Sequence, residues 1–247
     1  LFSAITQSCD IYFYDLAFKM GVDNMSKYLG DFGFGKNTAL DISEARDGLL
    51  PTREWKRALR GRAWYPGDSL NMGIGQGFML STPLQLAAAT AMMANRGRWV
   101  QPALLKSISG EKADARQRVV EMQDVQLKNP DDWGFIIDAM SEVMHGKRGT
   151  ARRSGSRASY RMAGKTGTAQ VVGIKQGEKY DAEALSERNR DHALFIGFAP
   201  VNDPQIAVAV IVENGGGGST SAAPVARAMF DEWILNLNNV ELEGEDK

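Results

Sequence analysis

The sequence predicts an α/β fold of the α+β type, in which a mostly antiparallel sheet is covered by helices. Two observations predict it. Three stretches of strand length and strand composition lie in the second half of the chain, at 161–172, 192–199 and 205–212. Stretches with the apolar spacing of helices lie before and after them. A large helical block therefore precedes the sheet, and a helix follows it.

Four helices are predicted before the sheet, over 11–20, 24–32, 84–95 and 131–145. Gly21 ends the first of them. The third has the clearest boundaries, because Thr82 can cap its first turn and Pro83 fits the first helical position. A basic stretch over 146–161 follows the fourth helix, and we expect it to be flexible.

The last two predicted strands are joined by a turn-rich link, 200–204, which favours an antiparallel hairpin. A final helix over 222–237 is expected to carry an apolar face made of Val225, Met229, Trp233, Ile234 and Leu237. We therefore predict one domain over 1–240. It contains a helical block (1–145), a strand-rich part (161–212) and the final helix (222–237), and an acidic tail covers 241–247.

Composition excludes several classes of function. The chain has 247 residues, 43% of them apolar, so it can bury a sizeable core. Its formal net charge of -1 gives no field for binding nucleic acid or an anionic membrane. Its single cysteine cannot form an intrachain disulfide. No apolar run reaches the roughly 18 to 20 residues of a membrane span.

The most informative motif is Lys165-Thr166-Gly167-Thr168, inside the first predicted strand. On an extended chain Lys165 and Gly167 share one face, and the two threonines share the other. The glycine allows a close approach to the backbone, and the lysine supplies positive charge. A phosphate-binding loop is excluded, because Ser159 stands where that loop needs a glycine. An ordinary edge strand with a solvated lysine remains an alternative.

A second motif, Ser8-Cys9-Asp10, precedes the first predicted helix. The Ser8 hydroxyl can both donate and accept a hydrogen bond, as a proton relay must. The alternative is structural, because Asp10 can cap the helix that follows. Cys9 is most simply interpreted as a small buried apolar residue. Ser109-Gly110-Glu111-Lys112 has the spacing of a nucleophilic Ser-x-x-Lys, but its polar surroundings argue against that role.

The motifs at Ser8 and Lys165 resemble those of the transpeptidase domain of class B penicillin-binding proteins. The segments 73–77, 82–87 and 192–200 resemble it too, so the resemblance covers almost the whole chain. The Ser-Cys-Asp form is similar to that of the cell-elongation members in Gram-negative bacteria. The resemblance implies the penicillin-binding/serine beta-lactamase-like fold. It also implies a D,D-transpeptidase that crosslinks peptidoglycan stem peptides ending in D-Ala-D-Ala, through a serine acyl-enzyme that beta-lactams also form.

The resemblance implies a role for each motif residue. Ser8 and Lys165 would belong to the catalytic proton network, and Asp10 would contact the acyl side chain. Thr166, Gly167 and Thr168 would bind substrate, and the Thr168 backbone amide would form half of the oxyanion hole. The loop 174–190 would flank the cleft as a lid. Cys9 is a candidate ligand for a structural zinc, with the other ligands upstream; the chemistry itself needs no cofactor.

The family's Ser-x-x-Lys nucleophile should lie just upstream of residue 1, with two strands of the sheet. We therefore expect this chain to be inactive alone and not independently stable. The resemblance also implies a glycan-strand polymerase as partner. It places the protein at the periplasmic face of the bacterial inner membrane, anchored by an N-terminal helix outside this chain. The alternatives are a beta-lactamase, a D,D-carboxypeptidase or a penicillin sensor of the same fold, and a non-catalytic scaffold domain.

Overall fold

The computed structural model describes residues 1–39, 41–42, 44–105, 122–173, 181 and 184–237. Ser109 and Lys112, most of the predicted lid and the acidic tail lie outside the described residues. The contacts divide the chain into two compact units, Leu1–Cys9 with Asn129–Lys247, and Asp10–Lys128. The predicted helical block is thus divided between the two units, and a single domain over 1–240 stays a prediction.

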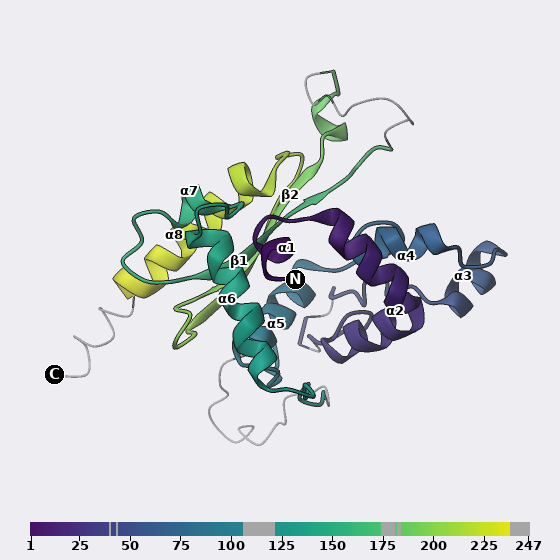
Figure 1. Cartoon of the computed structure of the whole chain (residues 1–247), viewed down its shortest axis with the longest axis horizontal. Coiled ribbons are helices and arrows are strands. Elements are labelled where there is room, and N and C mark those ends of the chain that lie inside the picture. The colour runs from purple at the N-terminus through teal and green to yellow at the C-terminus, as the bar shows by residue number, and fades with distance from the viewer. Residues whose placement is uncertain (40, 43, 106–121, 174–180, 182–183, 238–247) are drawn as a thin grey trace. The chain divides into compact units, whose positions relative to one another are not determined.

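The first unit contains the sheet (Figure 1). Its helices are α1 (Phe2–Thr6), α6 (Asp131–His145), α7 (Arg152–Gly155) and α8 (Ala223–Asp231), with shorter turns η1 (Glu187–Asn189), η2 (Gly218–Ala222) and η3 (Glu232–Leu237). Its strands are β1 (Ala163–Ala169), β2 (His192–Ala199) and β3 (Ile206–Val212), antiparallel in that order. The predicted strands, their hairpin and the helix 131–145 are confirmed.

Strand β2 lies between β1 and β3 and forms the centre of this unit's core. Ala193, Phe195, Phe198 and Ala199 are fully buried along it. Helix α6 packs on β1 and on α1, whereas α8 packs on β2 and β3. These burials on both faces explain why the sequence of β2 is almost continuously apolar.

The predicted apolar face of the final helix is wrong. Val225, Met229 and Trp233 are 44%, 45% and 39% exposed, whereas Ala226 and Phe230 are fully buried. Both sets repeat at a spacing of four residues, so periodicity alone did not distinguish them. The small Ala222, Ala223 and Ala226, all fully buried, let the helix approach the sheet closely. Ile234 is partly buried.

The second unit contains α2 (Asp10–Asp31), α3 (Arg53–Arg60), α4 (Pro66–Gly73) and α5 (Pro83–Ala94). Gly21 interrupts α2 with φ 71° and ψ 160°, which separates the two helices predicted there. Helix α5 begins with reciprocal hydrogen bonds: Gln85 N donates to Thr82 Oγ1 at 3.1 Å, and Thr82 N donates to Gln85 Oε1 at 2.9 Å. Within the described ranges, no helix is both long and apolar enough to cross a membrane.

Helices α3 and α4 were not predicted, and a buried lysine joins them. Lys56 is 4% exposed and forms an ion pair with Asp68. Its ammonium also lies 4.7 Å from the ring centroid of Tyr65 and 5.4 Å from that of Phe78. Asp68 in turn accepts the Tyr65 backbone N–H at 2.7 Å and closes the first turn of α4. We call these four residues the Lys56 cluster.

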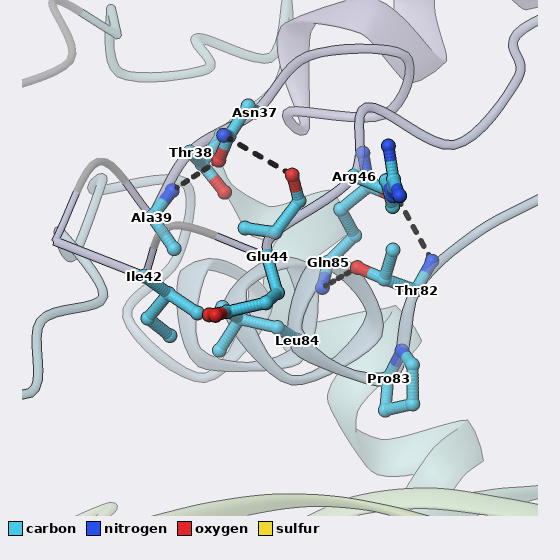
Figure 2. Close-up of a pocket in the computed structure, with 11 residues that line it drawn as sticks. Asn37, Thr38, Ala39, Ile42, Glu44, Arg46, Thr82, Pro83, Leu84 and Gln85 are labelled. Carbon is cyan, nitrogen blue, oxygen red and sulfur yellow. Dashed lines mark hydrogen bonds between the residues drawn. The ribbon is translucent and has the colours of Figure 1, made fainter.

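A pocket of about 350 Å³ lies between the loop 37–46 and the start of α5 (Figure 2). Gln85 fixes this loop, because its Nε2 donates to the carbonyl oxygens of Lys36 at 3.0 Å and Asp47 at 2.8 Å. The lining is mostly apolar, with Ile42, Pro83 and Leu84 among its residues. These hydrogen bonds hold the residues on either side of the loop against the start of α5.

Candidate active site

Ser8 occupies a strained backbone position immediately after α1. Cys9 N donates to the Ala4 carbonyl at 2.9 Å, and Ser8 N donates to the Ile5 carbonyl at 3.3 Å. This pair of bonds is the Schellman motif that ends many helices, and its second-last residue adopts a left-handed conformation. Ser8 has φ 55° at that place, where glycine is usual. Such strain in a polar residue is typical of functional sites.

Lys165, in the middle of β1, reaches this serine. Its Nζ donates to Ser8 Oγ at 2.7 Å and to the Thr166 carbonyl at 2.8 Å. Ser8 is exposed and Lys165 is partly buried. The structure thus brings together two residues that are 157 positions apart and that the sequence analysis singled out separately.

Thr166 and Thr168 lie on the other face of β1, as strand alternation requires. In the antiparallel register Thr166 is opposite Phe195 and Thr168 is opposite Ala193. The Thr166 hydroxyl lies 2.9 Å from the Thr150 hydroxyl, and Thr168 is exposed. Of the two threonines, Thr168 therefore presents its side chain to solvent.

The backbone of η2 comes close to Gly167 on β1, through Gly218. A Cβ added to Gly218 would lie 2.4 Å from the Gly167 carbonyl oxygen and 2.3 Å from that of Leu194. A Cβ on Gly167 itself would lie 3.3 Å from the Leu194 Cβ. The close approach expected at this strand is thus made by the chain at Gly218, which has no room for a side chain.

Asp10 and Cys9 lie at the boundary of the two units. Asp10 is the first residue of α2, where its carboxylate meets the positive end of the helix dipole. Cys9 is exposed, so its interpretation as a buried apolar residue is wrong.

The described residues do not fit a complete zinc site at Cys9. Among them, no group of three histidine, cysteine, aspartate or glutamate side chains could hold a metal ion. His145 Nε2 accepts the Met162 N–H at 3.1 Å, and His192 Nδ1 accepts the Asn214 N–H at 2.9 Å. A zinc ion bound through Cys9 stays a prediction.

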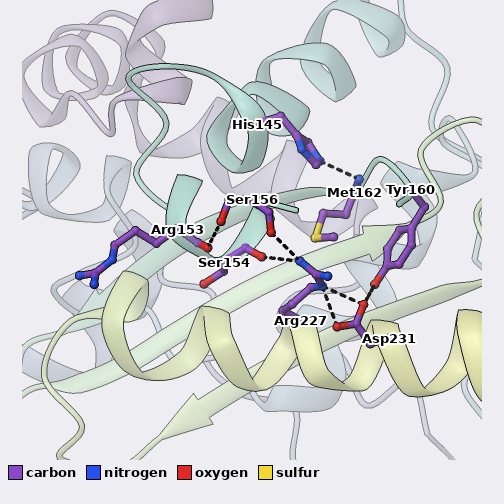
Figure 3. Close-up of polar contacts among 8 residues, drawn as sticks. All are labelled: His145, Arg153, Ser154, Ser156, Tyr160, Met162, Arg227 and Asp231. Atoms are coloured by element: carbon purple, nitrogen blue, oxygen red, sulfur yellow. Dashed lines mark hydrogen bonds and ion pairs between the residues drawn. The ribbon is translucent and has the colours of Figure 1, made fainter. Parts of the chain in front are cut away.

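The segment before β1 is held by a charged network on α8 (Figure 3). Arg227 Nε donates to both carboxylate oxygens of Asp231 at 2.8 and 2.9 Å, and its guanidinium also donates to the Ser154 carbonyl at 2.9 Å. The Tyr160 hydroxyl donates to Asp231 at 2.8 Å. Burial and this hydrogen bond both raise the pKa of Tyr160. Tyr160 therefore remains a neutral donor to Asp231.

The prediction of a flexible stretch over 146–161 is wrong where that stretch leaves α6. Ala151 is 1% exposed, and its N–H donates to the Val143 carbonyl at 3.0 Å. A Cβ on Gly149 would lie 2.3 Å from the carbonyl oxygens of Glu142 and Val143. The chain thus folds back on α6 and places Thr150 beside Thr166. Sequence reasoning missed Thr150, and the neighbouring glycine was the available signal.

Comparisons with known proteins agree with these motifs. The family model described as "Penicillin binding protein transpeptidase domain" matches residues 1–231. The chain is 41% identical over 231 residues to the peptidoglycan D,D-transpeptidase MrdA of Haemophilus influenzae, covering 94% of this chain and 36% of that protein. It is 44% identical over 232 residues to MrdA of Acinetobacter baumannii, covering 94% and 34%.

Solved structures give the same result. The structure of Pseudomonas aeruginosa PBP2 in complex with WCK 5153 superposes with a TM-score of 0.84 at 48% identity, covering 96% of this chain and 48% of that chain. A complex of Helicobacter pylori PBP2 with MreC superposes with a TM-score of 0.80 at 29% identity, covering 96% and 40%. The chain spans about a third of the length of the curated relatives that it matches.

Proposed function

Because the chain belongs to the penicillin-binding protein transpeptidase family, we propose that it forms part of a peptidoglycan D,D-transpeptidase that acts in cell elongation. The substrates are stem peptides ending in D-Ala-D-Ala, and beta-lactams occupy the same site. The observation that carries the proposal is the 2.7 Å hydrogen bond from Lys165 Nζ to Ser8 Oγ. It joins a cation to a hydroxyl that can itself donate, which is the arrangement a proton relay needs.

The proposed chemistry uses this pair as a relay. A serine of the full-length protein gives its proton to a base outside this chain and attacks the carbonyl of the penultimate D-alanine. It forms an ester, and the bond to the terminal D-alanine breaks. The leaving amine takes the proton of the Ser8 hydroxyl, and Ser8 takes one from the Lys165 ammonium. A second stem's amine then attacks the ester and gives its proton to Ser8, which returns one to Lys165. The base outside this chain returns its proton to the leaving serine oxygen. We assign the attacking serine outside this chain, whose one Ser-x-x-Lys match begins at Ser109.

The neighbouring residues of β1 and Asp10 have binding roles in this proposal. Thr168, exposed on the opposite face from Lys165, and Thr166 hold the terminal carboxylate. The Thr168 backbone N–H stabilises the oxyanion, an interaction worth about 3 kcal/mol in other acyl transferases. Gly167 binds substrate between these two threonines. Asp10 contacts the acyl side chain.

We also propose partners and a location. One similar solved structure is the complex of Helicobacter pylori PBP2 with MreC, and another shows a peptidoglycan synthase complex that coordinates polymerization and crosslinking. By analogy, this protein works with a glycan-strand polymerase. It acts at the periplasmic face of the inner membrane and is anchored by a helix outside this chain.

The test is intact-mass spectrometry of the full-length protein after incubation with a penicillin, together with a stem pentapeptide and an amine acceptor. We expect a stable one-drug adduct, release of D-alanine and formation of the crosslinked product. Ser8→Ala should slow acylation, and Ser3→Ala, an exposed serine earlier in α1, should not.

Other outcomes identify the alternatives. Rapid loss of the adduct with hydrolysed drug indicates a beta-lactamase, and D-alanine release without transfer indicates a carboxypeptidase. An adduct without turnover indicates a penicillin sensor. A folded protein that forms no adduct would overturn the proposal and favour the alternative of a non-catalytic scaffold domain. The isolated 247-residue chain is expected to form no adduct.

A structural zinc bound through Cys9 is a separate proposal, and it needs ligands from outside the described residues. Zinc quantification on the full-length protein tests it. We expect about one ion per chain, reduced in Cys9→Ser; equal zinc content in the two proteins would contradict it.

A further inference from the structure

We propose that Thr150 is a positioning residue that keeps Ser8 and Lys165 within hydrogen-bonding distance. The proposal rests on the proposed function, in which that pair relays protons. Thr150 belongs to neither motif, and it lies in the segment between α6 and α7.

Two contacts support this role. The Thr150 backbone N–H donates to the Thr6 carbonyl at 3.3 Å, at the end of α1. The Thr150 hydroxyl lies 2.9 Å from the Thr166 hydroxyl on β1. Thr6 is two residues before Ser8, and Thr166 is the residue after Lys165. One residue therefore connects the two chain segments whose side chains must meet.

The position of Thr150 is itself fixed from both sides. The neighbouring Ala151 is buried and bonded to α6 through the Val143 carbonyl. On the other side, Arg227 on α8 donates a hydrogen bond to the carbonyl of Ser154 in α7 (Figure 3). Thr6 is also anchored, because it is 7% exposed and its hydroxyl donates to the Phe2 carbonyl at 3.0 Å. A rigid residue between two rigid segments can set the distance between them.

Removing the Thr150 hydroxyl leaves the Thr166 hydroxyl without its 2.9 Å partner and loosens β1 against α1. The Lys165–Ser8 hydrogen bond should then be made in a smaller fraction of molecules. Binding of a penicillin does not need that bond, but the acylation step does in the proposed mechanism. A positioning role therefore predicts a larger effect on the acylation rate than on the initial affinity.

The experiment compares Thr150→Val, which keeps the shape without the hydroxyl, with Thr150→Ser, which keeps the hydroxyl. In the full-length protein we expect Thr150→Val to lower the acylation rate constant about tenfold, as the loss of one hydrogen bond does. The initial penicillin affinity should fall less than the rate, because Thr168 still holds the terminal carboxylate, and Thr150→Ser should restore most of the rate. Thr90→Val is the matched control, because its buried hydroxyl donates to the Leu86 carbonyl in the other unit.

A second measurement does not need penicillin. Competitive acetylation of Lys165, followed against pH by peptide mass spectrometry, reports its hydrogen bonding, with exposed Lys27 as internal reference. Thr150→Val should move the Lys165 profile toward that of Lys27, and Thr150→Ser should not. Unchanged acylation and an unchanged Lys165 profile in Thr150→Val overturn the inference. If the wild-type protein is not acylated, the proposed function is wrong, and the acetylation profile alone decides the role of Thr150.

Discussion

Lys56 and Lys165 are both hydrogen-bonded lysines, one in each unit, in contrasting surroundings. Lys56 is 4% exposed, paired with the carboxylate of Asp68 and covered by the rings of Tyr65 and Phe78. Lys165 is partly exposed and donates to the hydroxyl of Ser8 and to a backbone carbonyl. A carboxylate and aromatic rings attract the ammonium, whereas a hydroxyl can both accept and donate a hydrogen bond.

The comparison separates two uses of one side chain. In the Lys56 cluster the lysine pairs with the carboxylate of Asp68 and so connects α3 and α4. At Lys165 the partner is an exposed serine in a strained conformation, held there by the end of α1. The first lysine should therefore matter for stability and the second for catalysis.

Replacing Lys165 is expected to give the largest effect. Lys165→Met should lower the acylation rate of the full-length protein by about 10²- to 10⁴-fold, because general acid–base catalysis contributes about that much. Its melting temperature should change little, since the side chain is only partly buried. Stopped-flow acylation with a chromogenic cephalosporin measures the rate, and Lys27→Met, an exposed lysine, is the control. A wild-type acylation rate in Lys165→Met would show that Lys165 is not needed for catalysis.

Replacing Lys56 should show the opposite pattern. Lys56→Met leaves the carboxylate of Asp68 without its buried counter-charge, which typically lowers the free energy of unfolding by about 3 kcal/mol or more. Urea denaturation measures this loss, and the acylation rate per folded molecule should stay unchanged.

The double variant Lys56→Met/Asp68→Asn distinguishes the ion pair from simple packing. It should recover part of the lost stability, because the neutral amide can still accept the Tyr65 N–H. A double variant as unstable as Lys56→Met alone would show that the pair is not what joins α3 and α4.

The sequence predicted those parts of the fold that depend on local patterns. The break at Gly21 and the Thr82 cap of α5 were visible because their physical causes lie within a few residues of each other. Strands β2 and β3 were visible because burial on the sheet leaves an apolar run. Ser8 and Lys165 were found from the motifs that contain them, although their contact spans 157 positions.

The parts that were missed depend on contacts between distant segments. Val225 and Ala226 both belong to four-residue repeats, and only the close packing of α8 on the sheet decides which one is buried. Helix α4 is joined to α3 through Lys56, twelve positions before Asp68. Thr150 meets Thr166 because the chain folds back on α6, and the only local sign of that fold is the neighbouring Gly149.

Two substitutions of Ser8 separate the effect of its hydroxyl on acylation from the effect of its strained backbone on stability. Ser8→Gly and Ser8→Ala both remove the hydroxyl that accepts from Lys165, so both should slow acylation to a similar extent. They should differ in stability, because glycine adopts φ 55° freely and alanine does not. The free energy of unfolding of Ser8→Gly should exceed that of Ser8→Ala by about 1 kcal/mol, measured by urea denaturation. Equal stabilities would mean that residue 8 is not left-handed in solution.

The smallest expected effect concerns His145. It tests whether the unit that contains Ser8 and Lys165 also contains a group with a purely structural role. Burial, with the nearby positive charge of Arg161, lowers the pKa of His145, and its Nε2 accepts the Met162 N–H ahead of β1. The folded state therefore binds the proton less readily than the unfolded chain. Stability is complete above the unfolded pKa of about 6.5 and falls as the pH drops through it.

Replacing His145 with glutamine should keep an acceptor for the Met162 N–H and remove this titration. Between about pH 7.5 and pH 5.5, the melting temperature of the wild-type protein should fall more steeply than that of His145→Gln. The acylation rate at pH 7.5 should be the same in both proteins, because His145 bonds only backbone and lies outside the Ser8–Lys165 pair. Parallel melting curves would show that His145 does not titrate in this window. A slower acylation rate in His145→Gln would instead extend the catalytic network to the end of α6.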